Sequence, residues 1–140
     1  MELNRRETLA LGAGAALMTV LPFRAFASAS DDLIAEFTGG AEVTEGGALE
    51  LTAPEIAENG NTVPIAVSAE GASAIMVLAT GNPTPPVGTF TFGPLAGSRS
   101  ASTRIRLAGT QDVVAIAKME DGTFTRAAKT VKVTIGGCGG

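Results

Sequence analysis

The sequence predicts an all-β protein, an immunoglobulin-like β-sandwich of about seven strands with a short N-terminal helix and a flexible glycine-rich C-terminal arm. From residue 48 to residue 135, apolar and polar residues alternate with a period of two, which is typical of half-buried strands. Clusters of Gly, Asn, Asp and Pro interrupt this alternation at short intervals, as turns do. The chain has 140 residues, of which about 111 remain after a predicted export signal, so it has room for one small domain.

Residues 1–29 have the three parts of an export signal, which we expect to be removed. Arg5 and Arg6 precede the apolar stretch 9–21, and small residues allow cleavage after Ala27 or Ala29. The apolar stretch is shorter than the roughly 17–25 residues that span a bilayer, so no membrane anchor is expected. Adjacent arginines before a weakly hydrophobic core resemble a twin-arginine signal, which predicts export of the folded protein to the periplasm. An ordinary Sec signal is the alternative.

A short helix is predicted directly after the signal. Ser30 is a suitable N-cap, two aspartates follow it, and Gly39-Gly40 ends the pattern. Three apolar residues at helical spacing would form one face, which we expect to pack at the edge of the domain. They are Leu33, Ile34 and Phe37.

Seven strands are predicted in the rest of the domain, which extends from residue 30 to residue 135. Asp121-Gly122, between the last two, is the strongest hairpin signal in the chain. Pro64 has no N–H to donate, so it predicts an edge strand or the start of a strand. The predicted strands are Ala48–Ala53, Thr62–Ala69, Ser73–Thr80, Thr89–Phe92, Thr103–Ala108, Asp112–Met119 and Phe124–Ile135.

The inward-facing residues of these strands are mostly aliphatic. On the last strand Phe124 and Ala128 share one phase, whereas Val131 and Val133 share the other. A bulge near Ala127 would keep both sets inside one core. The predicted core residues are Val63, Ile65, Val67, Ile75, Val77, Phe90, Phe92, Ile105, Leu107, Val114, Ile116, Val131, Val133 and Ile135.

Composition excludes several classes of function. The net charge is −4, and removing three Arg and two Glu with the signal leaves 7 basic and 12 acidic residues, or −5, which does not suit a nucleic-acid binder. The chain has no histidine, so it cannot use histidine as an acid, a base or a metal ligand. Its acidic residues lack metal-ligand spacing, and we expect no metal and no cofactor. Arg99, Arg104 and Arg106 form one basic cluster, which either meets an acidic partner or stays solvated.

The only cysteine, Cys138, lies in the terminal sequence Gly136-Gly137-Cys138-Gly139-Gly140. Glycines on both sides favour a mobile swinging arm over residues 136–140. No histidine or cation in the arm activates the thiol, and the nearby terminal carboxylate disfavours the thiolate. We therefore expect Cys138 to be a point of covalent attachment and not a catalytic residue. The alternative is an exported structural or binding sandwich that uses Cys138 for an intermolecular disulfide.

Several segments together resemble the SoxY carrier family of bacterial thiosulfate oxidation. They are the segment 54–64 (Pro-Glu-Ile-Ala-Glu-Asn-Gly-Asn-Thr-Val-Pro), Asn82-Pro83, the segment 90–94, the closing hairpin and the terminal Gly-Gly-Cys-Gly-Gly. The resemblance covers the whole mature chain.

The resemblance implies a carrier that holds thiosulfate-derived sulfur on Cys138 and has no catalytic apparatus of its own. It implies a heterodimer with a SoxZ-like subunit. It also implies visits to a c-type cytochrome that conjugates thiosulfate, to a manganese hydrolase that releases sulfate, and in some systems to a sulfur dehydrogenase. Only Cys138 and its glycines correspond to functional residues of that family.

Overall fold

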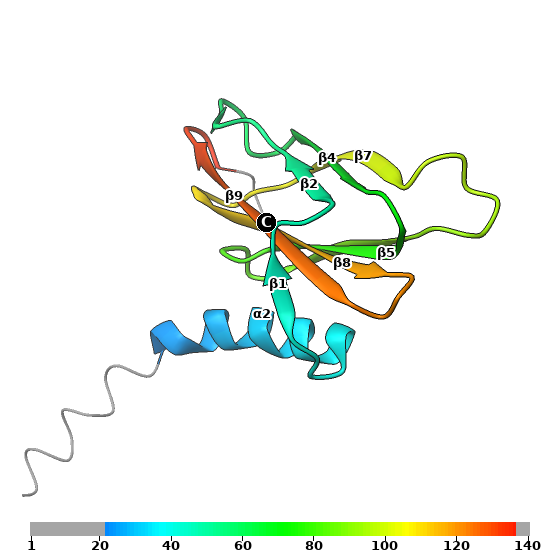
Figure 1. Ribbon diagram of the computed structural model, residues 1–140. Coiled ribbons are helices and arrows are strands. Elements are labelled where there is room, and N and C mark those ends of the chain that lie inside the picture. Colours follow the sequence, from blue (N-terminus) through cyan, green and yellow to red (C-terminus); the bar gives the residue numbers. More distant parts are fainter. Residues whose placement is uncertain (1–21, 137–140) are drawn as a thin grey trace, which may run out of the picture.

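The computed structural model describes residues 22–136, which form one helix and nine strands stacked in three layers (Figure 1). Helix α2 (Pro22–Thr38) is one outer layer, a six-stranded sheet is the middle layer, and a three-stranded sheet is the other outer layer. The strands are β1 (Val43–Glu45), β2 (Leu49–Thr52), β3 (Ile56–Ala57), β4 (Val63–Ala69), β5 (Ala72–Ala79), β6 (Pro86–Thr91), β7 (Ser100–Ile105), β8 (Gln111–Met119) and β9 (Phe124–Val133).

The two sheets confirm the predicted β-sandwich. The large sheet has the order β1-β9-β8-β5-β6, with β3 paired to the far end of β9, and the small sheet has the order β2-β4-β7. Strands β1 and β3 pair with β9 in parallel, and the other pairs are antiparallel. These two short strands were not predicted, because two or three residues are too few to show a period of two. They raise the number of strands above the predicted seven.

The hairpin predicted at Asp121-Gly122 is confirmed. Strands β8 and β9 pair without a break from Gln111↔Val131 to Lys118↔Phe124. Gly122 has a φ of +87°, a conformation that favours glycine. The Oδ1 atom of Asp121 accepts hydrogen bonds from the backbone N and the Oγ1 of Thr123, at 2.9 and 2.6 Å.

Pro64 is the second residue of β4, at the predicted start of a strand. It pairs with Arg104 of β7, whereas β2 pairs with β4 only from Ala66 onward, so the missing N–H lies beyond the end of β2. Strand β7 begins at Ser100, three residues before the predicted start, because it follows β4 as far as the pair Ser100↔Ser68.

The main core lies between the two sheets. Most of the predicted core residues contribute to it, with Val63, Ile75 and Val131 fully buried. Ile135 is an exception, since its side chain is 66% exposed beyond the end of β9. Val114 and Ile116 are also buried, but they belong to a second cluster on the opposite face of the large sheet. On β8 the residues that face the sandwich core are Val113, Ala115 and Ala117.

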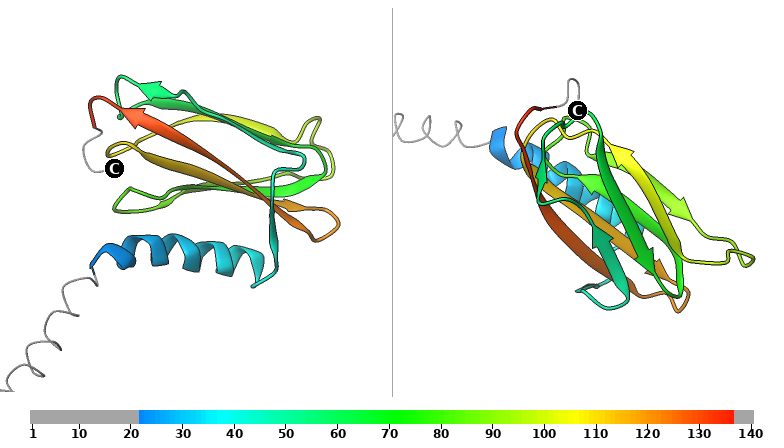
Figure 2. Two further views of the ribbon diagram at one scale, coloured as in Figure 1. Left: turned by 60° about the vertical axis from the view of Figure 1, so that its left-hand side comes forward. Right: turned by 90° about the horizontal axis from the view of Figure 1, so that it is seen from above.

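The second cluster lies between the large sheet and α2, which runs along the outer face of this sheet (Figure 2). Leu33, Ile34 and Phe37 of the helix pack on it, and the Phe37 and Phe124 rings meet edge to face with their centroids 5.9 Å apart. The predicted position at the domain edge is therefore wrong, because the helix covers a sheet face. The residues that the sheet contributes to the second cluster are Met76, Leu78, Val114, Ile116 and Phe124.

The helix also begins earlier than predicted. It extends back to Pro22, so Ser30 is an interior, buried residue of the helix and not its N-cap. No helix in the described part of the chain is long and apolar enough to cross a membrane.

The predicted bulge near Ala127 is absent, since the β8–β9 register is continuous through Ala115↔Ala127 and Val114↔Ala128. The two apolar phases of β9 serve two different cores. Phe124 packs beneath the helix, and Val131 packs between the sheets. A sheet that is buried on both faces needs no bulge to hide both sets of side chains.

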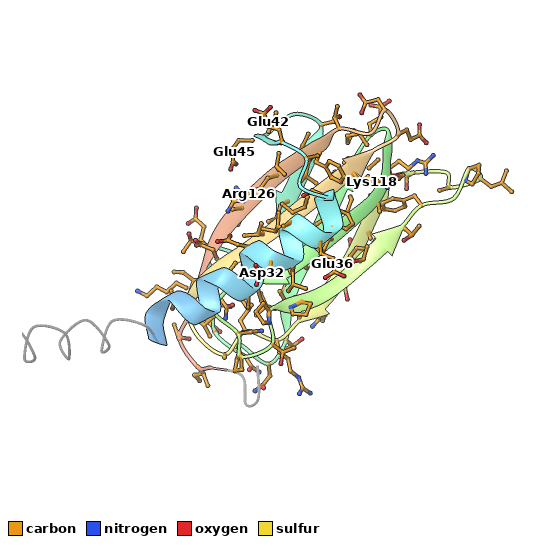
Figure 3. All side chains as sticks on the ribbon, turned by 90° about the horizontal axis from the view of Figure 1, so that it is seen from below. Asp32, Glu36, Glu42, Glu45, Lys118 and Arg126 are labelled. Carbon is orange, nitrogen blue, oxygen red and sulfur yellow. The ribbon has the colours of Figure 1, made fainter. Side chains whose placement is uncertain are left out.

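Charged residues surround the helix-covered face (Figure 3). Arg126 of β9 donates to Glu45 of β1 at 2.7 Å, joining two residues that are paired in the parallel ladder. Asp32 and Glu36 are exposed on the helix. These charged groups lie outside the apolar cluster, which the helix covers, and they keep the outer surface of this layer solvated.

Candidate functional site: the root of the C-terminal arm

The thiol Cys138 lies outside the described residues, as do Gly137, Gly139 and Gly140 of the predicted arm and Arg5 and Arg6 of the predicted signal. Gly136 is the last residue that the structure describes. The candidate site is therefore the place where the arm leaves the domain, and Gly136 and its neighbours define it.

The first support of the arm root is the turn at residues 57–61, part of the segment 54–64 that resembles the SoxY family. The backbone N of Thr134 donates to the carbonyl oxygen of Ala57 at 3.0 Å, and its Oγ1 donates to that of Glu58 at 3.1 Å. The N of Gly60 then donates to the carbonyl oxygen of Ile135 at 2.7 Å. These bonds continue the β3–β9 pairing past the last ladder residue, so the chain is held as far as Ile135.

The second support is the loop 106–110. The backbone N of Leu107 donates to the carbonyl oxygen of Gly60 at 2.8 Å, so the loop is bonded to the turn that holds Ile135. Thr110 adds a direct link, because its Oγ1 accepts from the N of Val133 at 3.0 Å. Leu107 is fully buried, which fixes the loop in the sandwich core.

A buried amide pair holds this loop from behind. Asn82 is 3% exposed, and its Nδ2 donates to the carbonyl oxygen of Arg106 at 2.8 Å. Its Oδ1 accepts from the N of Ala108 at 2.9 Å and from the Nε2 of Gln111 at 2.7 Å. Gln111 also accepts from the N of Gly81 and donates to the carbonyl oxygen of Gly109. Buried amides with this many partners fix the loop in one conformation.

Gly136 lies directly against this loop. A Cβ atom built on Gly136 would come far inside van der Waals distance of the Ala108 carbonyl oxygen. That oxygen belongs to the backbone, so it cannot rotate away as a flexible side chain would. We call Asn82 and the residues 57–61 and 106–111 the collar, since together they surround the root of the arm.

Asn59-Gly60 and Asn82-Pro83 both have the composition of turns, but the sequence does not predict the roles of these residues. The structure shows that Asn59 accepts from the N of Asn61 at 3.0 Å and thereby shapes the turn that holds Ile135. Asn82 and Gln111 were missed as site residues. An Asn before a proline is an ordinary turn signal, and nothing in the sequence links it to a glutamine 29 positions later.

The predicted basic cluster divides into two parts. Arg99 donates to Glu120 at 2.9 Å and to the carbonyl oxygen of Gly93 at 3.0 Å. Arg104 and Arg106 instead line a shallow groove beside Asn82 and Thr84, near the collar. Within the described residues, no three acidic or thiol side chains are grouped as they would be at a metal site.

The family comparison connects this fold to a function. A model of the family described as sulfur oxidation protein SoxY matches residues 34–138, about three quarters of the chain, and the match ends on the cysteine. The chain belongs to the SoxY family. A solved structure agrees, the sulfur carrier protein SoxY from Chlorobium limicola f thiosulfatophilum, with 38% identity and a TM-score of 0.68. That match covers 78% of this chain and 99% of the other.

More distant structures share the fold alone. Superoxide reductase (neelaredoxin) from Ignicoccus hospitalis superposes with a TM-score of 0.55 at 19% identity, covering 62% of this chain and 80% of that one. A putative superoxide reductase from Thermotoga maritima gives a TM-score of 0.51 at 16% identity, covering 69% and 89%. Comparison with curated protein sequences finds no significant match. The family match and the SoxY structure from Chlorobium limicola together support a carrier role in sulfur oxidation.

Proposed function

We propose that this protein is a periplasmic carrier that holds thiosulfate-derived sulfur covalently on Cys138 and presents it to partner enzymes. The observation that supports this most is the family match, which extends through residue 138 and so includes the only cysteine of the chain. The similarity to a solved structure named as a sulfur carrier supports the same role.

The chemistry asks little of the carrier itself. Loading joins the Cys138 sulfur to the terminal sulfur of thiosulfate, with loss of one proton and transfer of two electrons to an oxidising partner, for which a c-type cytochrome is suitable. Water then cleaves the sulfur–sulfonate bond in a hydrolytic partner, releasing sulfate and leaving a persulfide on Cys138. A sulfur dehydrogenase would oxidise that persulfide further. Each step needs the Cys138 sulfur, free or carrying its cargo, to be exposed on a tether, which a Gly-Gly-Cys-Gly-Gly terminus provides.

Two further parts of the proposal concern location and assembly. The twin-arginine-like signal in residues 1–29 supports export to the periplasm, where a free thiol would be exposed to oxidation unless it carried a cargo. Family membership supports association with a SoxZ-like subunit. Both parts are independent of the cargo chemistry.

Replacing the thiol tests the central claim. Cys138→Ser should abolish thiosulfate-dependent turnover in a reconstituted system and leave the melting temperature unchanged, since the described core lies elsewhere. The intact mass of protein purified from the periplasm should show thiosulfate- or sulfur-derived additions on Cys138. If only a disulfide-linked dimer is found, the alternative is correct, namely a structural or binding subunit joined through Cys138.

A further inference from the structure

The contacts at the collar constrain where the arm begins. The sequence predicts an arm of five freely rotating residues that begins at Gly136. Yet the backbone is hydrogen-bonded through Ile135, and Gly136 packs on the Ala108 carbonyl. Only Gly137 separates Gly136 from Cys138 in the sequence. With so short a tether, the direction of the chain at Gly136 controls which part of space the thiol can reach.

The direction at Gly136 depends on Asn82 through an unbroken series of contacts. Asn82 holds the carbonyl oxygen of Arg106 and the N of Ala108, on either side of buried Leu107. The oxygen of Ala108 in turn lies against Gly136. No charged group takes part in the series, and its geometry is set by backbone atoms and one buried amide.

We infer that Asn82 is a positioning residue for the carrier reaction, because it fixes the loop against which Gly136 packs and thereby sets the direction in which the arm leaves the domain. Gly136 is glycine because a side chain there would push the arm off this loop, and not because it must be flexible. The inference rests on the proposed function only where it concerns delivery of the cargo, since the direction of the arm is a property of the protein alone.

The single cysteine allows a direct test of the direction. A nitroxide attached to Cys138 of the full mature chain broadens the amide NMR signals of the residues that it visits. In the wild type we expect this broadening to fall on one sector around the collar. In Gly136→Ala and in Asn82→Ala the broadened set should change. The matched control is Gly97→Ala, in the loop between β6 and β7 and outside the collar, where an added Cβ meets nothing within 4 Å.

Delivery is measured on the same variants. Gly136→Ala and Asn82→Ala should lower kcat/KM for carrier turnover by about tenfold or more, since small misplacements of a reacting group are costly. Alkylation of the thiol by a small reagent should be unchanged, which would show that its own reactivity is kept, and a cooperative thermal transition would show that the variants are folded. Gly136→Ala lies beyond the last strand, so it remains informative if Asn82→Ala does not fold.

Three results would overturn the inference. One is a broadening pattern in Gly136→Ala or Asn82→Ala identical to that of the wild type, and another is a pattern in Gly97→Ala that changes as much. The third is a changed pattern with normal turnover, which would show that the direction has no role in delivery. The NMR measurement needs no sulfur substrate. Failure of the wild type to carry sulfur would therefore refute the proposed function and leave the result on direction standing.

Discussion

At the scale of single residues, the buried amide pair Asn82 and Gln111 is expected to contribute strongly to stability, because both side chains are buried and hydrogen-bonded. Asn82→Ala removes three hydrogen bonds and leaves the N of Ala108 without that partner. We expect the free energy of unfolding to fall by about 2–4 kcal/mol, because unpaired buried groups cost more than the bond itself contributes. Urea denaturation measures this loss.

A double-mutant cycle shows whether the pair acts as a unit. Gln111→Ala should also destabilise, and the double variant should lose less than the sum of the two single losses, since the Nε2 to Oδ1 bond at 2.7 Å is then counted only once. Strictly additive losses would contradict a shared network.

Asp121 gives a pH-dependent prediction. Hydrogen bonds first from the side chain and then from the backbone N of Thr123 lower the pKa of this exposed carboxyl below its usual 3.8. A folded-state pKa below the unfolded value stabilises the protein above the unfolded pKa, and this contribution is lost as pH falls through the folded pKa. Asp121→Asn should therefore lose less stability than the wild type on acidification from neutral pH to below the folded-state pKa of this carboxyl. Parallel melting curves over that range would rule out a role for this carboxyl.

The residue scale also shows where sequence reasoning is strong and where it stops. The sequence alone allows Cys138 to be proposed as the attachment residue, because it is the only thiol and stands among glycines. Asn82 could not, because its partners Arg106, Ala108 and Gln111 are far away in the sequence and its role depends on burial. Gly136 was assigned to the arm for its flexibility, whereas its contact with Ala108 is visible only in three dimensions.

At the scale of elements, the helix was correctly predicted from its apolar spacing, but its place was predicted wrongly. Spacing identifies the face that packs and does not identify the surface on which it packs. The two apolar phases of β9 held the missing information, since Phe124 and Val131 on opposite faces imply a sheet covered on both sides. The sequence analysis assumed that the domain has one core. It therefore predicted a bulge near Ala127 to bring both apolar phases of β9 to the same side.

The contact between helix and sheet can be tested through Phe37. Its edge-to-face contact with Phe124 and its packing on the second cluster should make Phe37→Ala destabilising by about 2–3 kcal/mol, less than a fully buried phenylalanine because Phe37 is only partly buried. Glu36→Ala, on the exposed side of the same turn, is the matched control. Equal denaturation midpoints for the two variants would show that the helix is not docked.

Removal of the signal should leave this layer in place. Leu33, Ile34 and Phe37 all follow the predicted cleavage sites at Ala27 and Ala29. A protein that begins at Ser30 should therefore keep a cooperative thermal transition, whereas one that begins at Ala41 should expose the second cluster and bind a hydrophobic dye. Dye binding by both truncated proteins would show that residues before Ser30 are needed for docking.

At the scale of the whole molecule, the two ends of the sandwich differ. The collar and the arm root lie at one end, and the loop between β6 and β7 projects at the other (Figure 1). Leu95 in that loop is 98% exposed, and Ile56 and Ile135 are largely exposed as well. Single exposed apolar residues are normal on a protein surface and do not mark an interface, so the partner is expected from SoxY membership alone. With a SoxZ-like subunit we expect a one-to-one complex by sedimentation. A monomer that ignores that subunit would exclude the heterodimer.

The position of the arm at the end of β9 has a mechanical consequence. Strand β9 pairs with β8 along most of its length and with β1 and β3 in parallel on its other edge. A pull on the arm along the strand axis would load the hydrogen bonds of these pairs together in shear, because they run across the strand, instead of opening them one at a time. A partner that binds the cargo tightly and releases it slowly would therefore exert a pulling force on the carrier without unfolding it.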